Sequence, residues 1–438
     1  MSSVVEPSVI HPVPWRRPGS AEVSRQEAAE RGGASSAALW ATLAAALFLF
    51  SFGVLHYGFY VRDNLADTPI YAGYGHTMLH GGVPYRDFPV EYPPGALPVF
   101  ALPAVLTPGG TYAAYVAAFE WLIALCGAMV AAGAALVLVR RGASRVQVAA
   151  ALALVGLAPL ALGPVVVSRF DLWPAMLTIA ALAALLAERR RLALGVLGAA
   201  VAAKVYPAVL VGPVVVYIWR RAGRREAAVA ASVFVAVLAA FFVPFLVLSP
   251  GGLWRSLVGQ ASRPLQIESL GSGLLIALHH VQGLRVAVET SHGSQNLAGS
   301  APAVVALAQG ILQPCAVAFV WLWFMRGPAS TERLFRVCAA AVVAFVALGK
   351  VLSPQFLVWL LPLVPLLRGR RWLWAGALLA VALILTQLWF PYRYLRLTQQ
   401  LDPLASSLVL ARDLVLLALL AVVVWPAIRD RDDDAAAA

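Results

Sequence analysis

The sequence predicts an all-α protein that crosses a membrane many times. Of its 438 residues, 61% are hydrophobic and only 12% are charged, whereas a soluble domain is about half apolar and about a quarter charged. Apolar runs long enough to span a bilayer as a helix recur along the whole chain, and short arginine clusters separate them. Together these observations favour a polytopic bundle of about 12 transmembrane helices.

The arginine clusters indicate the orientation of this bundle. The formal net charge is +12, a value that a nucleic-acid-binding protein could also have. Here, however, the arginines lie between apolar runs, as cytosolic loops do under the positive-inside rule. We therefore expect the lipid bilayer, and no nucleic acid, as a partner. The expected location is the cell membrane, with both termini in the cytoplasm.

The first half of the chain begins with a polar leader. Residues 1–36 lack hydrophobic periodicity, so a disordered cytosolic N-terminal tail is expected there. Full spans are expected at 37–60, 112–139, 148–167 and 171–187, while the short segment 96–106 is expected to lie in the outer interface. Arginines bracket 192–219, and Lys204, Tyr206 and Pro207 interrupt it. Two short helices that meet at this interruption would keep both arginine clusters in the cytosol.

The second half continues the pattern. Spans are expected at 227–248, 301–324, 334–348, 356–367, 372–390 and 414–428, with a polar loop at 249–300. Residues 37–428 are thus expected to form one transmembrane domain, and 429–438 a cytosolic C-terminal tail. Three cysteines, Cys126, Cys315 and Cys338, lie inside apolar runs, which favours small core residues over a disulfide framework or a metal site.

This threading places the polar segments of the chain on one side of the membrane. The segments are 62–95, 168–173, 263–272, 350–355 and 391–403. The first contains YAGYGHTMLHGGVPYRDFPVEYPPG, which differs in composition from the Ala-, Leu- and Val-rich sequence around it. We expect these segments to assemble one cavity at the outer leaflet.

Two carboxylates near the first span are candidates for a general base. Asp63 and Asp67 follow the span directly, and partial burial at a cavity edge raises the pKa of a carboxylate toward that of a useful base. Asp67 has an alternative role. It precedes Thr68 and Pro69, so it could equally be the N-cap of a helix.

Two further polar groups allow a structural as well as a functional interpretation. Arg86, Asp87, Glu91 and Tyr92 in PYRDFPVEYPPG could bind a substrate or form local salt bridges in a rigid loop. In SRFDLWP, charged side chains at membrane depth are costly and often functional, but they could also form an internal ion pair. The two residues concerned are Arg169 and Asp171.

Cations and hydrogen-bonding side chains recur in the later segments. Lys204, in the helix break, suits a phosphate or carboxylate, although it could also snorkel to the interface. An exposed arginine on the outer side, such as Arg393, suggests an anionic partner such as a lipid phosphate, or attraction to headgroups. The groups suited to sugar hydroxyls or to the same anion are Arg263, Gln266 and Glu268 in SRPLQIESL and Lys350, Ser353 and Gln355 in GKVLSPQ.

The histidines do not favour a metal site. His76 and His80 would share one face of a helix, but HxxxH alone is a weak signal, and no glutamate follows the first histidine as in metalloproteases. The chain also lacks a Walker lysine loop, a dinucleotide-binding glycine fingerprint and a GxSxG elbow. We expect neither a metal nor another cofactor.

The ordered set of motifs resembles a known family. An early outer-face aspartate, Tyr71, the GGVPYRDFPVEYPPG loop, RFDLWP, KVYP and KVLSPQ are together similar to the GT-C superfamily of integral-membrane glycosyltransferases. The chain most resembles glycosyltransferase family 87, the polyprenol-phosphate-mannose-dependent mannosyltransferases of actinobacteria. The resemblance implies a helical first outer loop and an active site on the extracytoplasmic side.

The resemblance also implies substrates and roles. The donor would be a polyprenyl-phosphate sugar, and the acceptor a glycolipid or glycan. Asp67 matches the family's catalytic position best, with Asp63 as the second candidate. Arg263, Lys204, Lys350 or Arg393 would offset the charge on the leaving phosphate.

Mannose is the donor sugar that the resemblance implies, but one place departs from the family pattern. Members that build phosphatidylinositol mannosides often carry a histidine pair where this chain has Lys350, Ser353 and Gln355. The donor sugar therefore stays open.

Two other functions stay open as well. A transporter or flippase of lipid-linked glycans predicts inverted repeats and polar groups on both faces, and an envelope-assembly scaffold predicts that Asp67 is dispensable.

Overall fold

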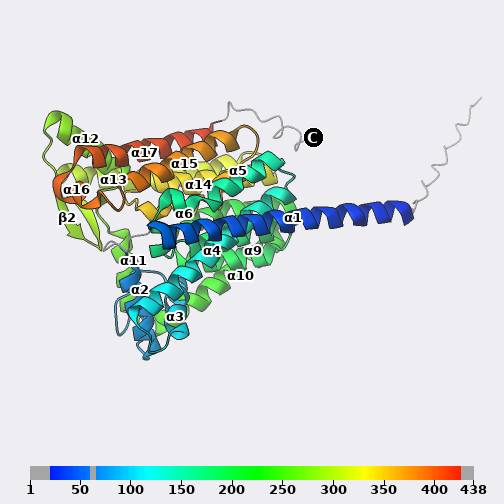
Figure 1. The fold of residues 1–438 in the computed structure, drawn as a ribbon, viewed down its shortest axis with the longest axis horizontal. Coiled ribbons are helices and arrows are strands. Elements are labelled where there is room, and N and C mark those ends of the chain that lie inside the picture. The colour runs from blue at the N-terminus through cyan, green and yellow to red at the C-terminus, as the bar shows by residue number, and fades with distance from the viewer. Residues whose placement is uncertain (1–19, 60–65, 426–438) are drawn as a thin grey trace, which may run out of the picture.

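The computed structural model describes residues 20–59 and 66–425, with side chains from residue 35 onward. Long helices lie side by side in one bundle (Figure 1). Six segments in the described residues are long and apolar enough to cross a membrane. They belong to α1 (Ser20–Val54), α4 (Tyr112–Arg140), α10 (Val211–Leu248), α13 (Ser300–Met325), α15 (Arg371–Trp389) and α17 (Pro403–Val424).

The other helical elements are shorter, some of them lie at the other predicted spans, and they include one π turn and several 3-10 turns. Along the chain these elements are η1 (Leu55–Phe59), α2 (Thr68–Leu79), η2 (Pro94–Ala96), α3 (Leu97–Leu106), α5 (Arg145–Gly156), α6 (Ala158–Leu162), α7 (Val165–Ser168), α8 (Leu172–Leu186), α9 (Arg190–Ala203), η3 (Tyr206–Leu210), α11 (Pro250–Ala261), α12 (Leu270–Gln282), α14 (Thr331–Ala347), η4 (Pro354–Leu360), η5 (Val364–Leu366) and α16 (Tyr394–Gln400). The predicted all-α membrane fold is confirmed.

The predicted helix break at Lys204 is present. Helix α9 ends at Ala203, Lys204 is extended with φ −158° and ψ 143°, and the 3-10 turn η3 follows. Pro207 lies in the first turn of η3, where its missing N–H costs nothing. Helix α10 is itself two helices, because Gly223 adopts φ 88° and ψ 166°, a conformation open mainly to glycine. The chain therefore runs as two short helices that meet at Lys204.

Three parts of the chain differ from the prediction. Helix α1 begins at Ser20, within the predicted disordered tail at 1–36, because SAEVSRQEAAER is rich in strong helix formers; residues 1–19 lie outside the described part. The last span is Pro403–Val424 instead of 414–428. It starts early because Asp402 caps it, accepting from the N–H of Ala405 at 2.8 Å. The tail at 429–438 lies outside the described residues.

The predicted loop at 249–300 is the third difference, since it is largely ordered. It contains α11, α12 and a small antiparallel sheet of β1 (Leu265–Gln266), β2 (Ala287–Ser291) and β3 (Ser294–Ala298), in the order β1-β3-β2. Alternation is hard to recognise in a strand of two residues, and β2 and β3 are joined by a tight His292–Gly293 turn with positive φ at both residues. Sequence periodicity therefore did not reveal this sheet.

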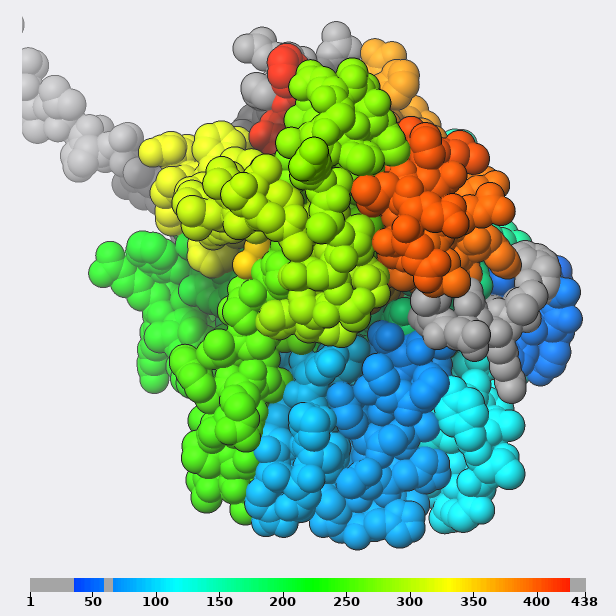
Figure 2. Space-filling view, turned by 90° about the vertical axis from the view of Figure 1, so that its left-hand side faces the viewer, coloured from blue at the N-terminus to red at the C-terminus, as the bar shows by residue number. Residues whose placement is uncertain are grey.

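Segments far apart in the sequence meet at one end of the bundle. In Figure 1, α2, α11, β2 and α16 all lie toward the left-hand end, opposite the C-terminus. Figure 2 shows this end face-on, with the region of α2 in blue, the β-sheet segment in green and α16 in orange. These are the segments that sequence analysis placed on one side of the membrane.

Candidate active site

A cavity of about 820 Å³ lies among these segments. Its lining comes from the start of α2, the loop before η2, the α9–η3 break, α11, the β-sheet and the segment after α14. The predicted single cavity is therefore present. The predicted site residues that line it are Asp67, Glu91, Tyr92, Arg169, Lys204, Arg263, Gln266, Glu268, Lys350, Ser353 and Gln355.

Asp67 stands at the N-terminus of α2 but does not cap it. Its backbone is helical (φ −85°, ψ −3°), and its side chain accepts no capping hydrogen bond. Instead, its Oδ1 atom lies 3.0 Å from Nη1 of Arg169, and the hydroxyl of Tyr71 donates to Oδ2 at 3.3 Å. The carboxylate is a quarter exposed and lines the cavity. Asp67 thus occupies the N-cap position that the sequence left open as an alternative, but its side chain makes no capping hydrogen bond.

The partners of Asp67 are held rigidly. Tyr71 is 1% exposed, and its ring stacks on Phe100 with centroids 4.5 Å apart. Phe170, next to Arg169, contacts the same ring edge-on at 5.8 Å. A carboxylate oxygen has two lone pairs, so each oxygen of Asp67 keeps one acceptor position after these contacts. Among the described residues, the Asp67 carboxylate is thus held in place while part of its acceptor capacity stays open.

A second ion pair lies beside the first. Asp171 is almost fully buried, and its Oδ1 accepts from Nζ of Lys204 and from Nε1 of Trp359, each at 2.6 Å. The Lys204 ammonium also lies 4.6 Å from the Phe170 ring centroid and 5.2 Å from that of Trp359. Lys204 therefore reaches the cavity from the helix break, and Asp171 supports it from behind.

A close backbone contact explains why the proline-rich loop ends in PPG. A Cβ atom on Gly95 would lie 2.5 Å from the backbone carbon of Ala202 and 2.6 Å from the nitrogen of Ala203. Only glycine allows this approach to the end of α9, directly before Lys204. Trp173 fixes the same loop by donating from Nε1 to the Gly95 carbonyl at 3.2 Å. The loop thus sets the position of the helix break.

The earlier part of the same loop lies elsewhere. Arg86 and Asp87 form a bidentate pair with two 2.9 Å hydrogen bonds, and both side chains are exposed. This pairing, with the Val83 N–H, lowers the pKa of Asp87 to about 2. Neither residue lines the cavity. Their geometry matches the local salt bridge that the sequence left open as an alternative.

On the opposite wall, three polar side chains form a chain of hydrogen bonds. Nε2 of Gln266 donates to Oε2 of Glu268 at 2.5 Å and to Oγ of Ser353 at 2.9 Å. All three residues are buried and line the cavity. Burial raises the pKa of Glu268 to about 8, although the Arg412 and Arg263 guanidinium groups oppose this shift. Burial thus favours the neutral form of the Glu268 carboxyl.

Two cations lie next to this network. Burial lowers the pKa of Arg263, and the carboxylates of Glu268 and Glu91 act in the opposite direction. Nζ of Lys350 donates to the carbonyl of Ala261 at 3.2 Å, and its own carbonyl accepts from the Gln266 N–H at 3.0 Å. In the part of the chain that the structure describes, neither cation forms an ion pair with a carboxylate. An incoming anion would find both available.

Comparison with known proteins identifies the family. The sequence profile of Glycosyltransferase family 87 matches residues 90–354. This chain belongs to glycosyltransferase family 87. The resemblance drawn from its sequence is thereby confirmed. The match covers Glu91, Arg169, Lys204, Glu268 and Lys350 but begins after Asp67, so the role of Asp67 depends on geometry alone.

Other comparisons add little. A solved structure, the crystal structure of ArnT from Cupriavidus metallidurans bound to undecaprenyl phosphate, is similar with a TM-score of 0.47 and 17% sequence identity. The similarity covers 88% of this chain and 76% of that chain. No curated protein matches this chain.

Several residues that line the site of this family 87 protein were missed by sequence analysis. The turn between β2 and β3 contributes Thr290, His292 and Gln295, and a Cβ on Gly293 would lie 3.3 Å from Oε1 of Glu91. Helix α11 adds Ser256, Leu257 and Gln260, and the aromatic wall comes from Tyr206, Phe356, Trp359 and Tyr394. The polar ETSHGSQN run was the available signal for the β2–β3 turn.

Some candidates do not contribute to the cavity lining. Arg393 does not line the cavity and donates from Nη1 to the Leu388 carbonyl at 2.5 Å, so it stabilises the end of α15. Asp63 lies outside the described residues. The histidine pair does not line the cavity: Nδ1 of His80 contacts the His76 carbonyl, and the His76 ring lies 5.6 Å from that of Tyr115. Over residues 20–59 and 66–425, no group of three or more potential ligands suits a metal ion.

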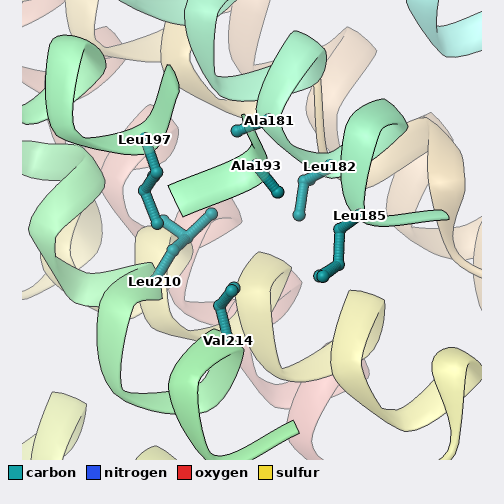
Figure 3. Close-up of a pocket in the computed structure, with 7 residues that line it drawn as sticks. All are labelled: Ala181, Leu182, Leu185, Ala193, Leu197, Leu210 and Val214. Carbon is teal, nitrogen blue, oxygen red and sulfur yellow. The ribbon is translucent and has the colours of Figure 1, made fainter. Parts of the chain in front are cut away.

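A second void lies inside the bundle and differs in every respect. Its volume is about 10 Å³, and only apolar side chains from α8, α9, η3 and α10 surround it (Figure 3). A void of this size and polarity stays dry. It is a packing gap, and the large cavity with its charged and polar side chains is the candidate active site.

Proposed function

We propose that this family 87 glycosyltransferase moves a sugar from a polyprenyl-phosphate donor to a hydroxyl group of a glycolipid or glycan acceptor, with Asp67 as the general base. The observation that carries the proposal is the Asp67 carboxylate, which faces a large cavity and makes no capping bond to its helix. A carboxylate that makes no capping bond and is held by two buried partners is well placed for proton transfer.

The chemistry follows from the cavity lining. Asp67 takes the proton of the acceptor hydroxyl, whose oxygen attacks the anomeric carbon from the face opposite the phosphate. The bond between that carbon and the phosphate oxygen breaks, and polyprenyl phosphate leaves with the bonding electrons. Arg263 and Lys350, with Lys204 nearby, stabilise the charge that develops on the phosphate. The anomeric configuration is inverted.

The distribution of arginines supports an extracytoplasmic site. Clusters such as those at 140–145, 189–191, 220–225 and 368–371 follow or precede spans whose other ends approach the cavity. Cytosolic loops carry the excess of Lys and Arg in membrane proteins. On this basis the cavity faces away from the cytoplasm, and both termini lie in it. Mannose is the proposed sugar, in line with the family resemblance of the motifs.

Sugar transfer by the purified protein tests this proposal. The protein in lipid would receive radiolabelled polyprenyl-phosphate-mannose and an actinobacterial lipid extract. Asp67→Asn keeps the shape of the side chain and removes the base, so transfer should fall by roughly a hundredfold or more. Asp402→Asn is the matched control, because Asn also caps a helix and Asp402 lies outside the cavity.

The outcomes separate the parts of the proposal. Transfer by wild type and Asp402→Asn, but not by Asp67→Asn, supports both the reaction and the base. Equal transfer by all three proteins would exclude Asp67 as the base. Absence of transfer by wild type with mannose, glucose and other polyprenyl-phosphate hexoses would exclude the donor class.

A further inference from the structure

The hydrogen-bond chain of Gln266, Glu268 and Ser353 has a fixed orientation. Both hydrogens of the Gln266 amide are used, one on Glu268 and one on Ser353. Oε1 of Gln266 also accepts from the Ser353 hydroxyl at 3.3 Å. In the described part of the chain, Oε1 of Glu268 accepts no hydrogen bond, although the residue lines the cavity. This arrangement offers a polyhydroxylated ligand a preformed polar surface.

The position of this hydrogen-bond network indicates which part of the donor it contacts. Arg263 precedes Gln266 by three residues, and the Gln266 N–H donates to the carbonyl of Lys350 at 3.0 Å. The network therefore adjoins the two cations assigned above to the phosphate. In a polyprenyl-phosphate sugar, the sugar is bonded directly to that phosphate. With the phosphate between these cations, the hydroxyl groups that fall against the network belong to the transferred sugar.

A buried arginine supports the network from behind. Arg412, in α17, is fully buried and donates from Nη2 to the main-chain carbonyl of Glu268 at 2.6 Å. It is paired with the adjacent, equally buried Asp413 at 2.7 Å. A charged pair inside a membrane-spanning helix is costly and is usually retained for a function. Here it fixes the backbone of a binding segment from a distant part of the chain.

The geometry points to Gln266, Glu268 and Ser353 as the subsite that binds the hydroxyl groups of the transferred sugar, and to Arg412 as the positioning residue that holds this subsite in place. The inference rests on the proposed function, because it takes a polyprenyl-phosphate sugar as the donor. It adds which part of that donor each residue contacts, and it gives a role to a pair of charges that the reaction itself does not use.

Binding of two ligands by the purified protein tests the subsite. One ligand is polyprenyl phosphate, and the other is the same lipid carrying mannose or glucose. Glu268→Met removes the hydrogen-bonding groups and keeps the side-chain length. Affinity for at least one sugar-bearing lipid should fall roughly 10- to 100-fold, the range for a hydrogen bond to a charged or strongly polar group. Affinity for polyprenyl phosphate should change by less than about threefold, because this ligand carries no sugar whose hydroxyl groups could bind Glu268.

Two smaller substitutions test whether the effect of Glu268→Met comes from a folding defect. Ser353→Ala removes one hydroxyl and should weaken the sugar-bearing lipid by about two- to tenfold. Arg412→Lys keeps the charge opposite Asp413 but loses the forked donor on Glu268. It should weaken the same ligand by about tenfold and should add little in the Glu268→Met background, because coupled residues are not additive.

A matched control is provided by Arg336 in α14, which contacts the opposite end of α17 from Arg412. Arg336 donates to the carbonyls of Val423, Val424 and Trp425 near the end of α17. Arg336→Lys makes the same substitution far from the cavity, so it should leave the affinities for both ligands unchanged.

Each result decides the inference. Selective weakening of the sugar-bearing lipid by Glu268→Met and Arg412→Lys, but not by Arg336→Lys, supports it. Equal weakening of both ligands, or of neither, overturns it while the proposed function stands. If Arg412→Lys and Arg336→Lys weaken the sugar-bearing lipid alike, Arg412 has only a structural role. If wild type binds neither ligand, the proposed function fails and the inference fails with it.

Discussion

Basic side chains at the two ends of the bundle bind different partners. At the cavity end, Arg169 contacts the carboxylate of Asp67 and Lys204 that of Asp171. At the other end, several arginines donate to main-chain carbonyls at helix ends, and Arg141 does so beside its ion pair with Glu332. Arg141 donates to Leu366 at 2.7 Å and Arg336 to Val423 at 2.8 Å.

The difference shows how one residue type serves two purposes. A guanidinium on a helix-end carbonyl satisfies an acceptor that the helix leaves open and adds a charge that fixes sidedness. A guanidinium on a carboxylate beside a cavity orients a reactive group. Both kinds of arginine lie near span ends in the sequence, so only the partner distinguishes them. Four predictions test this distinction, in order of expected effect.

The largest effect is expected at Arg169. Arg169→Gln removes the cation that holds Oδ1 of Asp67, and sugar transfer should fall by about a hundredfold, as when one electrostatic contact of an active site is removed. The measurement is kcat/KM for transfer in lipid. Arg336→Gln removes an arginine of the carbonyl-binding kind and should keep transfer near the wild-type rate. Equal losses in the two variants would contradict the distinction.

A loss of stability without a loss of activity is expected at the opposite end. Glu332 pairs with Arg141 across two helix ends, and the Arg141 side chain is only 3% exposed. Glu332→Gln should lower the free energy of unfolding by about 1–3 kcal/mol, the cost of weakening a hydrogen bond between charged groups. Denaturant unfolding in detergent measures this change. A matching loss of transfer per folded molecule would link this end to the reaction.

The next prediction concerns pH and Glu268. Its pKa is raised by burial from 4.5 to about 8 in the folded protein. Between these values the folded state binds more protons than the unfolded state, so stability must fall as pH rises from about 4.5 to about 8 and level off above. The slope for one such group is about 1.4 kcal/mol per pH unit.

Unfolding temperatures at pH 5 to 8 measure this slope. Glu268→Gln does not titrate and should flatten the curve over the same interval, whereas Asp402→Asn, at a half-buried helix cap, should leave it as in wild type. Identical curves for Glu268→Gln and wild type would mean that the Glu268 carboxyl is not held neutral.

The smallest effect is expected at Arg86 and Asp87. The pair is exposed and lies outside the cavity lining, and exposed ion pairs contribute little to stability. Arg86→Ala should leave transfer within about twofold of wild type, because such a pair has no buried partner to lose. Its unfolding temperature should also match wild type. A large loss of transfer would return the PYRD segment to the binding site.

Much of the architecture could be predicted from the sequence, because membrane spans are long and arginine clusters fix their direction. The break at Lys204 was predictable since one crossing would have left an arginine cluster outside. The start of α17 was not, because the cap at Asp402 and Pro403 is a local signal next to apolar residues that continue without interruption. The β-sheet was missed because its strands are short and its turn is polar.

The site was predictable in its parts and less so in its connections. Chemistry-bearing side chains stood out against an apolar background, and most of them line one cavity. Tertiary contacts decided the rest. Nothing in RFDLWP shows that Arg169 faces Asp67 and Asp171 faces Lys204. Arg412 and Asp413 went unnoticed because their role depends on the carbonyl of Glu268, which is far away in the sequence.

Arg263 and Lys350, which form no ion pair with a carboxylate of the described residues, affect the end of the proposed catalytic cycle. A polyprenyl-phosphate sugar carries one negative charge, but the spent carrier is a phosphate monoester, whose second ionisation has a pKa of about 6. The cavity therefore attracts the spent carrier more strongly than the fresh one. We expect departure of the carrier to slow turnover, so added salt, which screens that attraction, should speed the enzyme.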